Sequence, residues 1–219
     1  MSITIYGIGM SPFVRKVNFA LGVKGLEYEN ITVMPIGDDA PPEFKENSPL
    51  GKIPLANIDG NWLPDSSVIL AYLEKTRTDV PLLSDDAGEM ARALWFEEYA
   101  DSHMVSVMGG HLFAEVVLAP VFFNRESNLE EIELAKNEEI PAIFDYLESQ
   151  LNSDYLVGDT IGLADISVCS PLVSMLHCDV MCDASRWPKT AAYIDRLTAH
   201  PVIAAGIAEE KAMMSAMLG

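Results

Sequence analysis

The sequence has few cysteines, few basic residues and no long uncharged apolar run, and each shortage excludes a class of protein. Only Cys169, Cys178 and Cys182 occur among 219 residues, too few and too late in the chain for a disulfide framework. Paired Cys-x-x-Cys motifs are absent, so no metal site is predicted, although His177 stands beside Cys178. Buried free thiols are expected.

Acidic residues outnumber basic ones, 33 against 14, and the formal net charge is -19. Nucleic-acid binding draws its affinity from Lys and Arg that face phosphates, so a nucleic-acid partner is excluded. No uncharged apolar stretch approaches the roughly 20 residues that cross a bilayer. Residues 1–9 lack the basic flank and the apolar run of a signal peptide. The expectation is a cytoplasmic protein without a membrane segment.

The first third of the chain alternates strand and helix patterns in the order βαβαββα. Asp59-Gly60 between two apolar runs is typical of a hairpin turn. The predicted strands are 3–6, 30–34, 53–58 and 61–63, the predicted helices are 12–23 and 66–75, and a loop at 35–42 leads to a short turn.

Strand patterns end near residue 78, and an acidic stretch at 79–88 predicts a linker before an all-helical half at 89–219. Asn128 and Glu131 predict a capped helix start, and Pro141 predicts a kink or break. The stretch 89–119 is predicted to be one long helix or a bent pair, closed by Pro120. The other predicted helices are 128–151, 163–177, 187–199 and 202–217.

Three residue pairs stand where a strand meets a helix or a turn: Ser11-Pro12, Ile53-Pro54 and Asp65-Ser66. These are positions at which an α/β fold presents backbone N–H groups and hydroxyls to a small ligand. The pairs together predict a binding site in the first third of the chain.

With this order of elements, the chain resembles the cytosolic glutathione transferase family over its whole length. The resemblance is carried by the stretches SPFVRKV at 11–17, NSPLGKIP at 47–54, DSSVI at 65–69 and GDTIGLAD at 158–165. It implies a thioredoxin-like domain at 1–78, a linker at 79–88 and a helical bundle at 89–219. It also implies a cytoplasmic homodimer with a role in detoxification, for which glutathione is a co-substrate and no other cofactor is needed.

Ser11 is the first candidate for activating the glutathione thiol. With Pro12 at the first helical position, its hydroxyl and the helix N-terminus would face an anion. In serine-type members of the family, the matching residue bonds the glutathione sulfur. The alternative is a plain helix cap. Tyr6 is the rival donor, because tyrosine-type members carry a hydroxyl near that point; its alternative is an ordinary strand aromatic.

The other two pairs have roles that the resemblance implies. Pro54 matches a cis proline, and Ile53 before it would offer its backbone to the cysteinyl portion; a trans proline at a strand start is the alternative. Lys52 would meet a ligand carboxylate, unless it is solvated surface. Asp65 would take the γ-glutamyl amino group and Ser66 the γ-glutamyl carboxylate, and both are also natural caps.

Residues on the predicted helices 89–119 and 12–23 are candidates for an apolar second-substrate pocket. Met104, Met108 and His111 share one helical face, and Phe13 follows Pro12. The alternative for a methionine stripe is plain core. Because an acidic molecule repels an anionic tripeptide, local donors such as Lys52 and Arg15 must offset the repulsion, unless Arg15 is solvated or ion-paired.

Two classes of function follow. The first is a glutathione transferase that adds the activated thiolate to a small, mostly apolar electrophile; isomerase and dehalogenase activities on glutathione conjugates are variants of it. The second is a non-catalytic glutathione-binding or interaction protein of the same fold. A disulfide reductase needs a cysteine where Ser11 stands. Within the helical half, Asp165 is predicted to be a structural residue. It belongs to a capping box in which Gly162 replaces the usual Ser or Thr.

Overall fold

The computed structural model describes residues 2–34 and 39–218. The chain divides into two compact units, Met1–Leu82 and Leu83–Gly219. The division falls inside the stretch 79–88 that the sequence assigns to a linker. The first four residues of the predicted loop at 35–42 lie outside the described residues.

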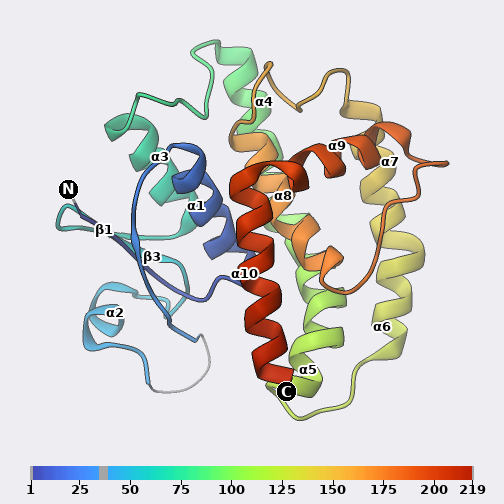
Figure 1. The fold of residues 1–219 in the computed structure, drawn as a ribbon, viewed down its shortest axis with the longest axis horizontal. Coiled ribbons are helices and arrows are strands. Elements are labelled where there is room, and N and C mark those ends of the chain that lie inside the picture. The colour runs from blue at the N-terminus through green and yellow to red at the C-terminus, as the bar shows by residue number, and fades with distance from the viewer. Residues whose placement is uncertain (1, 35–38, 219) are drawn as a thin grey trace. The chain divides into compact units, whose positions relative to one another are not determined.

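The first unit is a four-stranded sheet with helices on both faces, α1 and α3 on one and α2 on the other (Figure 1). The strand order is β2-β1-β3-β4, with β1 parallel to β2 and the other neighbours antiparallel. The βαβαββα prediction is confirmed. Its elements are β1 (Ile3–Tyr6), α1 (Pro12–Val23), β2 (Glu29–Ile31), α2 (Pro42–Asn47), β3 (Leu55–Ile58), β4 (Asn61–Pro64) and α3 (Ser66–Thr76).

Local chemistry explains where these elements begin and end. Pro12 occupies the first turn of α1, where the missing N–H costs nothing. Asp59 and Gly60 both have positive φ, 50° and 88°, which a tight hairpin between β3 and β4 requires. β3 begins at Leu55 rather than at residue 53, since Pro54 has no N–H to give to the ladder.

The second strand is shorter than predicted, three residues instead of five. Its ladder with β1 ends at the pair Tyr6 and Ile31, because β1 itself ends there. The N–H of Gly7, the residue after β1, donates to the carbonyl of Ile31. Val33 leaves the sheet and packs into the core beside Phe44 of α2. Burial, not strand pairing, therefore explains the apolar residues that follow β2.

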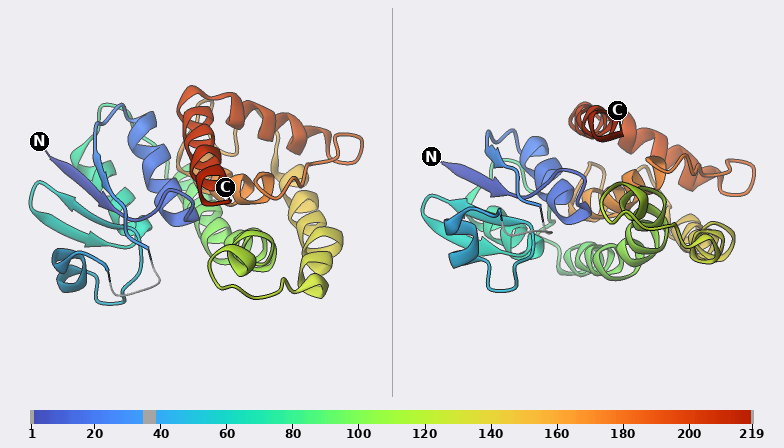
Figure 2. Two further views of the ribbon diagram at one scale, coloured as in Figure 1. Left: turned by 60° about the horizontal axis from the view of Figure 1, so that its bottom comes forward. Right: turned by 90° about the horizontal axis from the view of Figure 1, so that it is seen from below.

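The second unit is helical throughout its regular structure, and Figure 2 shows its helices from two directions. Ala87–Val121 is one continuous helix, and so is the run from α6 to α7. The elements are α4 (Ala87–Glu98), η1 (Tyr99–Leu118), α5 (Ala119–Val121), α6 (Leu129–Leu134), η2 (Ala135–Glu139), α7 (Ile140–Gln150), α8 (Leu163–Leu176), α9 (Pro188–Ala199) and α10 (Pro201–Leu218).

Two segments, η1 and η2, have π-type winding, in which an N–H bonds to the carbonyl five residues before it, as Ala119 does to Ala114. The predicted break at Pro141 is a change of winding: η2 ends just before it and α7 continues the helix. Pro120 does not close the first helix, which continues through it and ends one residue later at Val121.

The helix Ala87–Val121 is long and apolar enough to cross a membrane by length and composition, with a mean hydropathy of 1.6 over 18 residues. The expectation that no apolar segment is long enough to cross a membrane is therefore revised. That expectation considered only uncharged stretches, whereas a window of this hydropathy can contain one or two charged residues. A core helix of a folded unit meets the same measure, and Met104 and Leu112 of this helix are fully buried.

An ion-pair network joins the end of this helix to α6. The buried Glu115 carboxylate accepts hydrogen bonds from both terminal guanidinium nitrogens of Arg125. It also accepts one from the backbone N–H of Asn128 at 2.8 Å. These donors, Arg125 first, lower the pKa of Glu115 to about 2. Asn128 in turn caps α6 by accepting the N–H of Glu131, as the sequence predicts.

Asp165 is buried and structural. Its carboxylate accepts the N–H groups of Leu156 and Gly162, each at 3.0 Å, and the hydroxyl of Tyr193 at 2.8 Å. Burial raises the pKa of Asp165 to about 6 against the opposing effect of these donors. Gly162 has no side chain, so only the aspartate half of the capping box is formed.

The cysteines are free thiols, but only Cys169 is buried, and Cys178 and Cys182 are half-buried. Burial raises the pKa of Cys178 to about 12 and that of Cys182 to about 11. Over residues 2–34 and 39–218, no group of three or more His, Cys, Asp or Glu side chains could hold a metal ion.

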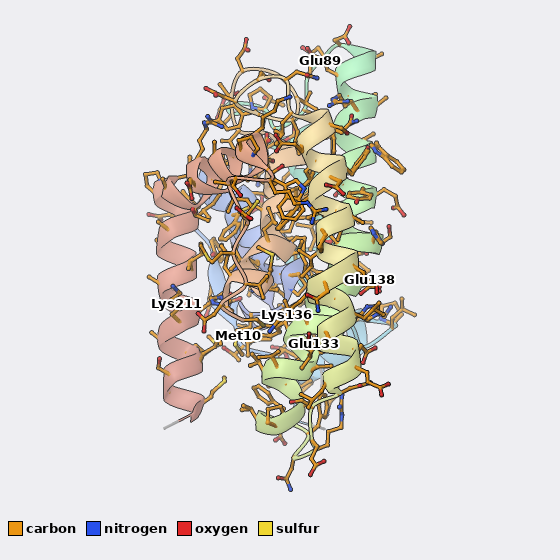
Figure 3. All side chains as sticks on the ribbon, turned by 90° about the vertical axis from the view of Figure 1, so that its right-hand side faces the viewer. Met10, Glu89, Glu133, Lys136, Glu138 and Lys211 are labelled. Carbon is orange, nitrogen blue, oxygen red and sulfur yellow. The ribbon has the colours of Figure 1, made fainter. Side chains whose placement is uncertain are left out.

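The acidic side chains lie mostly at the surface. Figure 3 shows Glu133 and Glu138 on the helix formed by α6 and η2, where both are exposed, with Lys136 between them. Such residues account for the net charge without burying it.

Candidate functional site

Gly7 lets three segments of the first unit meet at the end of β1. A Cβ atom on Gly7 would lie 2.5 Å from Cγ2 of Val14 in α1 and 3.3 Å from Cβ of Ile53. Contacts below 3.0 Å do not occur without displacement of the neighbour. The absence of a side chain here therefore allows the start of α1 to lie against the segment before β3.

Ser11 stands at the start of α1 with its backbone held on both sides. Its N–H donates to Ile8 at 3.0 Å, and its carbonyl accepts the N–H of Arg15 at 2.9 Å. Its side chain makes no capping hydrogen bond, at φ -68° and ψ 127°. The cap interpretation of this serine does not hold, and its hydroxyl remains available at the positive end of the helix.

Arg15 is almost completely buried, 1 % exposed, and is not the solvated residue that the sequence left open. Its Nη2 donates to the carbonyl of Met10 at 3.1 Å. The guanidinium thus fixes the turn that precedes Ser11 and places a cation behind it.

Tyr6 belongs to the core of the first unit. It is 5 % exposed, and its ring centroid lies 5.6 Å from that of Trp62 and 6.5 Å from that of Phe44. Burial first, and then the carboxylates of Glu43 and Glu29, raise the pKa of Tyr6. This is the environment of a strand aromatic.

The peptide bond between Ile53 and Pro54 is cis, as the resemblance implies. The carbonyl of Pro54 accepts the N–H of Asp65 at 3.3 Å, which ties this segment to the start of α3. Lys52 is exposed, and its ammonium has no partner in the part of the chain that the structure describes, while its carbonyl accepts the hydroxyl of Ser48 at 3.0 Å.

Asp65 caps α3. Its carboxylate accepts the N–H groups of Ser67 at 2.9 Å and Val68 at 3.3 Å, and its φ of 84° is rare for a residue other than glycine. Ser66 is 2 % exposed, and its hydroxyl has no hydrogen-bond partner among the described residues. The first turn of α3 therefore keeps one free hydroxyl beside a capped N-terminus.

A lysine that the sequence did not single out lies at this same turn. Lys16 is fully buried in α1, and its Nζ donates to Oγ of Ser67 at 3.3 Å. No sequence signal reveals a contact between residues 51 positions apart. Gly7 was also missed, although a glycine directly after a strand is a usable signal of close backbone approach.

The second-substrate residues are not confirmed as a pocket wall. Met104 and Met108 are fully buried, as core residues are, and Nδ1 of His111 lies 2.7 Å from a carboxylate oxygen of Glu139 in η2. For the methionines the structure favours the core alternative, and His111 is engaged in helix pairing. Phe13 is half-buried.

The three predicted pairs are brought together within the first unit. Gly7 joins the Ser11 end of α1 to Ile53, and the bond from Asp65 to Pro54 joins that segment to α3. The result is a set of hydroxyls and two helix N-termini, together with the basic side chains of Arg15, Lys16 and Lys52 and the capping carboxylate of Asp65. Such a set suits a small ligand that carries negative charge at more than one point.

Two family models match the chain. The "Glutathione S-transferase, N-terminal domain" model covers residues 10–76, and the "Glutathione S-transferase, C-terminal domain" model covers residues 113–210.

Individual proteins agree with these models. The chain is 31 % identical to the uncharacterized GST-like protein YibF of Escherichia coli, over 75 % of this chain and 77 % of that protein. It is 29 % identical to a probable maleylacetoacetate isomerase of Caenorhabditis elegans, over 77 % of this chain and 76 % of that protein. A glutathione S-transferase of Methylobacterium radiotolerans, solved in complex with glutathione sulfonate, superposes with a TM-score of 0.75 at 25 % identity, covering 94 % of this chain and 95 % of its own.

Proposed function

This chain belongs to the glutathione S-transferase family and is a transferase by that membership, and from this premise we propose that Ser11 activates the thiol of bound glutathione. The thiolate then attacks a small, mostly apolar electrophile. The thiol proton passes to solvent, a sulfur–carbon bond forms, and the electrophile either loses its leaving group or takes up a proton.

The observation that carries the proposal is the free hydroxyl of Ser11. The thiol of glutathione has an ordinary pKa of about 8.5, and lowering it by two units requires about 2.7 kcal/mol of preferential stabilisation of the thiolate. A hydroxyl at a helix N-terminus, with its backbone already fixed, donates to an anion without reorganisation. Arg15 behind the turn adds positive charge.

The remaining site residues bind the tripeptide in this proposal. The backbone of Ile53 and the segment at Pro54 receive its cysteinyl portion, and Lys52 receives a carboxylate. Asp65 takes the γ-glutamyl amino group, and Ser66 takes the γ-glutamyl carboxylate. Supporting this assignment, Ser66 has an unpaired hydroxyl, and Lys52 has an unpaired ammonium among the described residues. Glutathione is a co-substrate, and no other cofactor enters the reaction.

The Ser11→Ala variant tests the proposal. Turnover with a model electrophile is expected to fall at least about tenfold, which is about 1.4 kcal/mol of transition-state stabilisation. The ultraviolet absorbance of the thiolate against pH, measured on bound glutathione, is expected to show a lowered pKa in the wild type and a restored one in Ser11→Ala. Tyr6→Phe serves as the control and should leave the thiol pKa unchanged.

Unchanged turnover in Ser11→Ala, with a loss in Tyr6→Phe, would transfer the role to Tyr6. A thiol that binds without any lowering of its pKa would instead support the non-catalytic glutathione-binding protein.

A glutathione-dependent isomerase is the second candidate, favoured by the similarity to the probable maleylacetoacetate isomerase. In such a reaction the thiolate adds to a double bond, the bond rotates and the thiolate leaves, so glutathione is regenerated. Counting glutathione consumed per product separates the two, because a transferase uses one molecule each time and an isomerase uses none.

The assembly and setting are part of the proposal. We expect a cytoplasmic homodimer with a role in detoxification, and the exposed apolar side chains of Met90, Leu94 and Trp95 on α4 provide surface for a second copy. Sedimentation analysis of the purified protein checks the dimer.

A further inference from the structure

We propose that Lys16 is a positioning residue for glutathione, which raises affinity for the γ-glutamyl carboxylate by placing a fixed positive charge behind the first turn of α3. This inference rests on the proposed function. It assigns to this chain a charge that acts through Ser67 rather than by direct contact with the ligand.

The contact with Ser67 locates the charge. Nζ of Lys16 donates to Oγ of Ser67 at 3.3 Å, and Lys16 is fully buried in α1. Ser67 lies in the first turn of α3, next to Ser66, whose hydroxyl has no partner among the described residues. The ammonium is therefore one hydrogen bond away from the turn that presents this free hydroxyl.

The two buried lysines of the α1 region act at opposite ends of α3. Lys24 follows α1, and its Nζ bonds the carbonyls of Arg77 at 2.9 Å and Val80 at 2.7 Å and the carboxylate of Glu74 at 2.6 Å. A cation at a helix C-terminus complements the helix dipole, so Lys24 has a structural role.

Lys16 lies at the N-terminal end, where a cation opposes the dipole and an anion is favourable. The Asp65 carboxylate accepts two N–H groups of this turn. A second carboxylate, supplied by a ligand at Ser66, would gain from both the dipole and the ammonium, because a buried charge is screened less than an exposed one.

The test compares glutathione with 4-aminobutyryl-cysteinylglycine, which is glutathione without its α-carboxylate. In Lys16→Met, the Kd of glutathione is expected to rise at least about fivefold, within the range of helix-terminus and charge-assisted interactions. The Kd of the analogue is expected to change less than about twofold, since it lacks the group that the charge attracts. The KM of glutathione should rise with its Kd, whereas kcat at saturation should change less than about twofold.

Three further variants separate charge from structure. Lys16→Arg keeps the charge and is expected to restore most of the affinity. Lys16→Gln keeps a donor for Ser67 but removes the charge, and it is expected to behave like Lys16→Met; it also replaces Lys16→Met if that variant does not fold. Lys75→Met removes one exposed charge at the far end of α3 and should leave both Kd values unchanged.

Wild-type protein that does not take up glutathione in calorimetry overturns the proposed function itself. Wild-type protein that binds glutathione, with equal Kd changes for glutathione and the analogue in the Lys16 variants, overturns this inference alone. An equal loss in Lys75→Met also overturns it, because the effect would then belong to the general field of the molecule.

Discussion

Two serines at helix starts leave their hydroxyls free, and only the second of them, Ser66, has a neighbouring aspartate that caps its helix. Ser11 precedes α1, and its side chain makes no hydrogen bond to the N–H groups of that helix. Ser66 is the first residue of α3, whose N–H groups donate to the carboxylate of Asp65. The side-chain oxygen of a serine before a helix ordinarily accepts a hydrogen bond from an N–H of the first turn. At both places here, the hydroxyl makes no such bond, as the proposed ligand contacts require.

Gly7→Ala is expected to lower the free energy of unfolding by about 1–3 kcal/mol, the usual cost of a forced contact in a packed region. The reason is the 2.5 Å approach of the new Cβ to Val14, which must push α1 away from Ile53. The affinity for glutathione should fall as well, since Ser11 and Ile53 separate. Urea unfolding and calorimetry measure the two effects.

Gly25→Ala is the matched control for Gly7→Ala. Gly25 has a positive φ of 67° with open space around it, so this variant strains the backbone without displacing a neighbour. It should lose stability but keep its affinity for glutathione. A Gly7→Ala variant that binds as tightly as the wild type would contradict the role given to this glycine.

At the level of single residues, the sequence predicted the helix and strand boundaries that the fold brings together, but not the contacts that each residue makes. Short-range rules locate Ser11, Pro54 and Asp65 because each marks a helix or strand boundary. The free hydroxyl of Ser11, the burial of Arg15 and the bond from Lys16 to Ser67 depend on tertiary contacts, which have no local signature.

Among the elements, α1 has the predicted limits because Pro12 marks its start and its apolar spacing continues to Val23. The predictions were less accurate where pairing decides: β2 stops when its partner strand stops. The π-type winding of η1 and η2 was not predicted, since an apolar stripe has nearly the same appearance in either kind of turn.

Glu115→Gln should destabilise the helical unit in a pH-dependent way. The pKa of Glu115 is lowered to about 2 from its usual 4.5, chiefly by Arg125, so its ionised form favours the folded state. This stabilisation is fully present above about pH 4.5 and is lost as the pH falls towards 2. Urea unfolding of wild type and variant should therefore differ most near neutrality and converge in acid.

Glu130→Gln, at an exposed position of the first turn of α6, is the control for Glu115→Gln. Its effect on stability should be small at every pH. A difference between wild type and Glu115→Gln that stays constant down to pH 3 would contradict the assigned ion pair.

At the scale of the molecule, the net charge of -19 opposes the approach of an anionic tripeptide. Raising the ionic strength from about 10 mM to about 150 mM shortens the Debye length from about 30 Å to about 8 Å. The repulsion by distant exposed carboxylates is screened, while the buried Lys16 is screened less. The Kd of glutathione is therefore expected to fall by up to about threefold as salt is added.

The Lys16→Met variant should respond to salt more strongly than the wild type, because it lacks one of the attractive charges that offset the repulsion. An uncharged electrophile should show a KM that salt does not change. A Kd that rises with salt in the wild type would mean that local cations outweigh the acidic surface.

The two half-buried thiols of the protein, Cys178 and Cys182, are poor nucleophiles at neutral pH. With pKa values near 12 and 11, Cys178 and Cys182 stay protonated at neutral pH, where alkylation requires the thiolate. In the proposed reaction, these two thiols therefore do not compete with the activated sulfur of the bound tripeptide. An enzyme that works as proposed would thus avoid alkylation of these two cysteines by its own substrates.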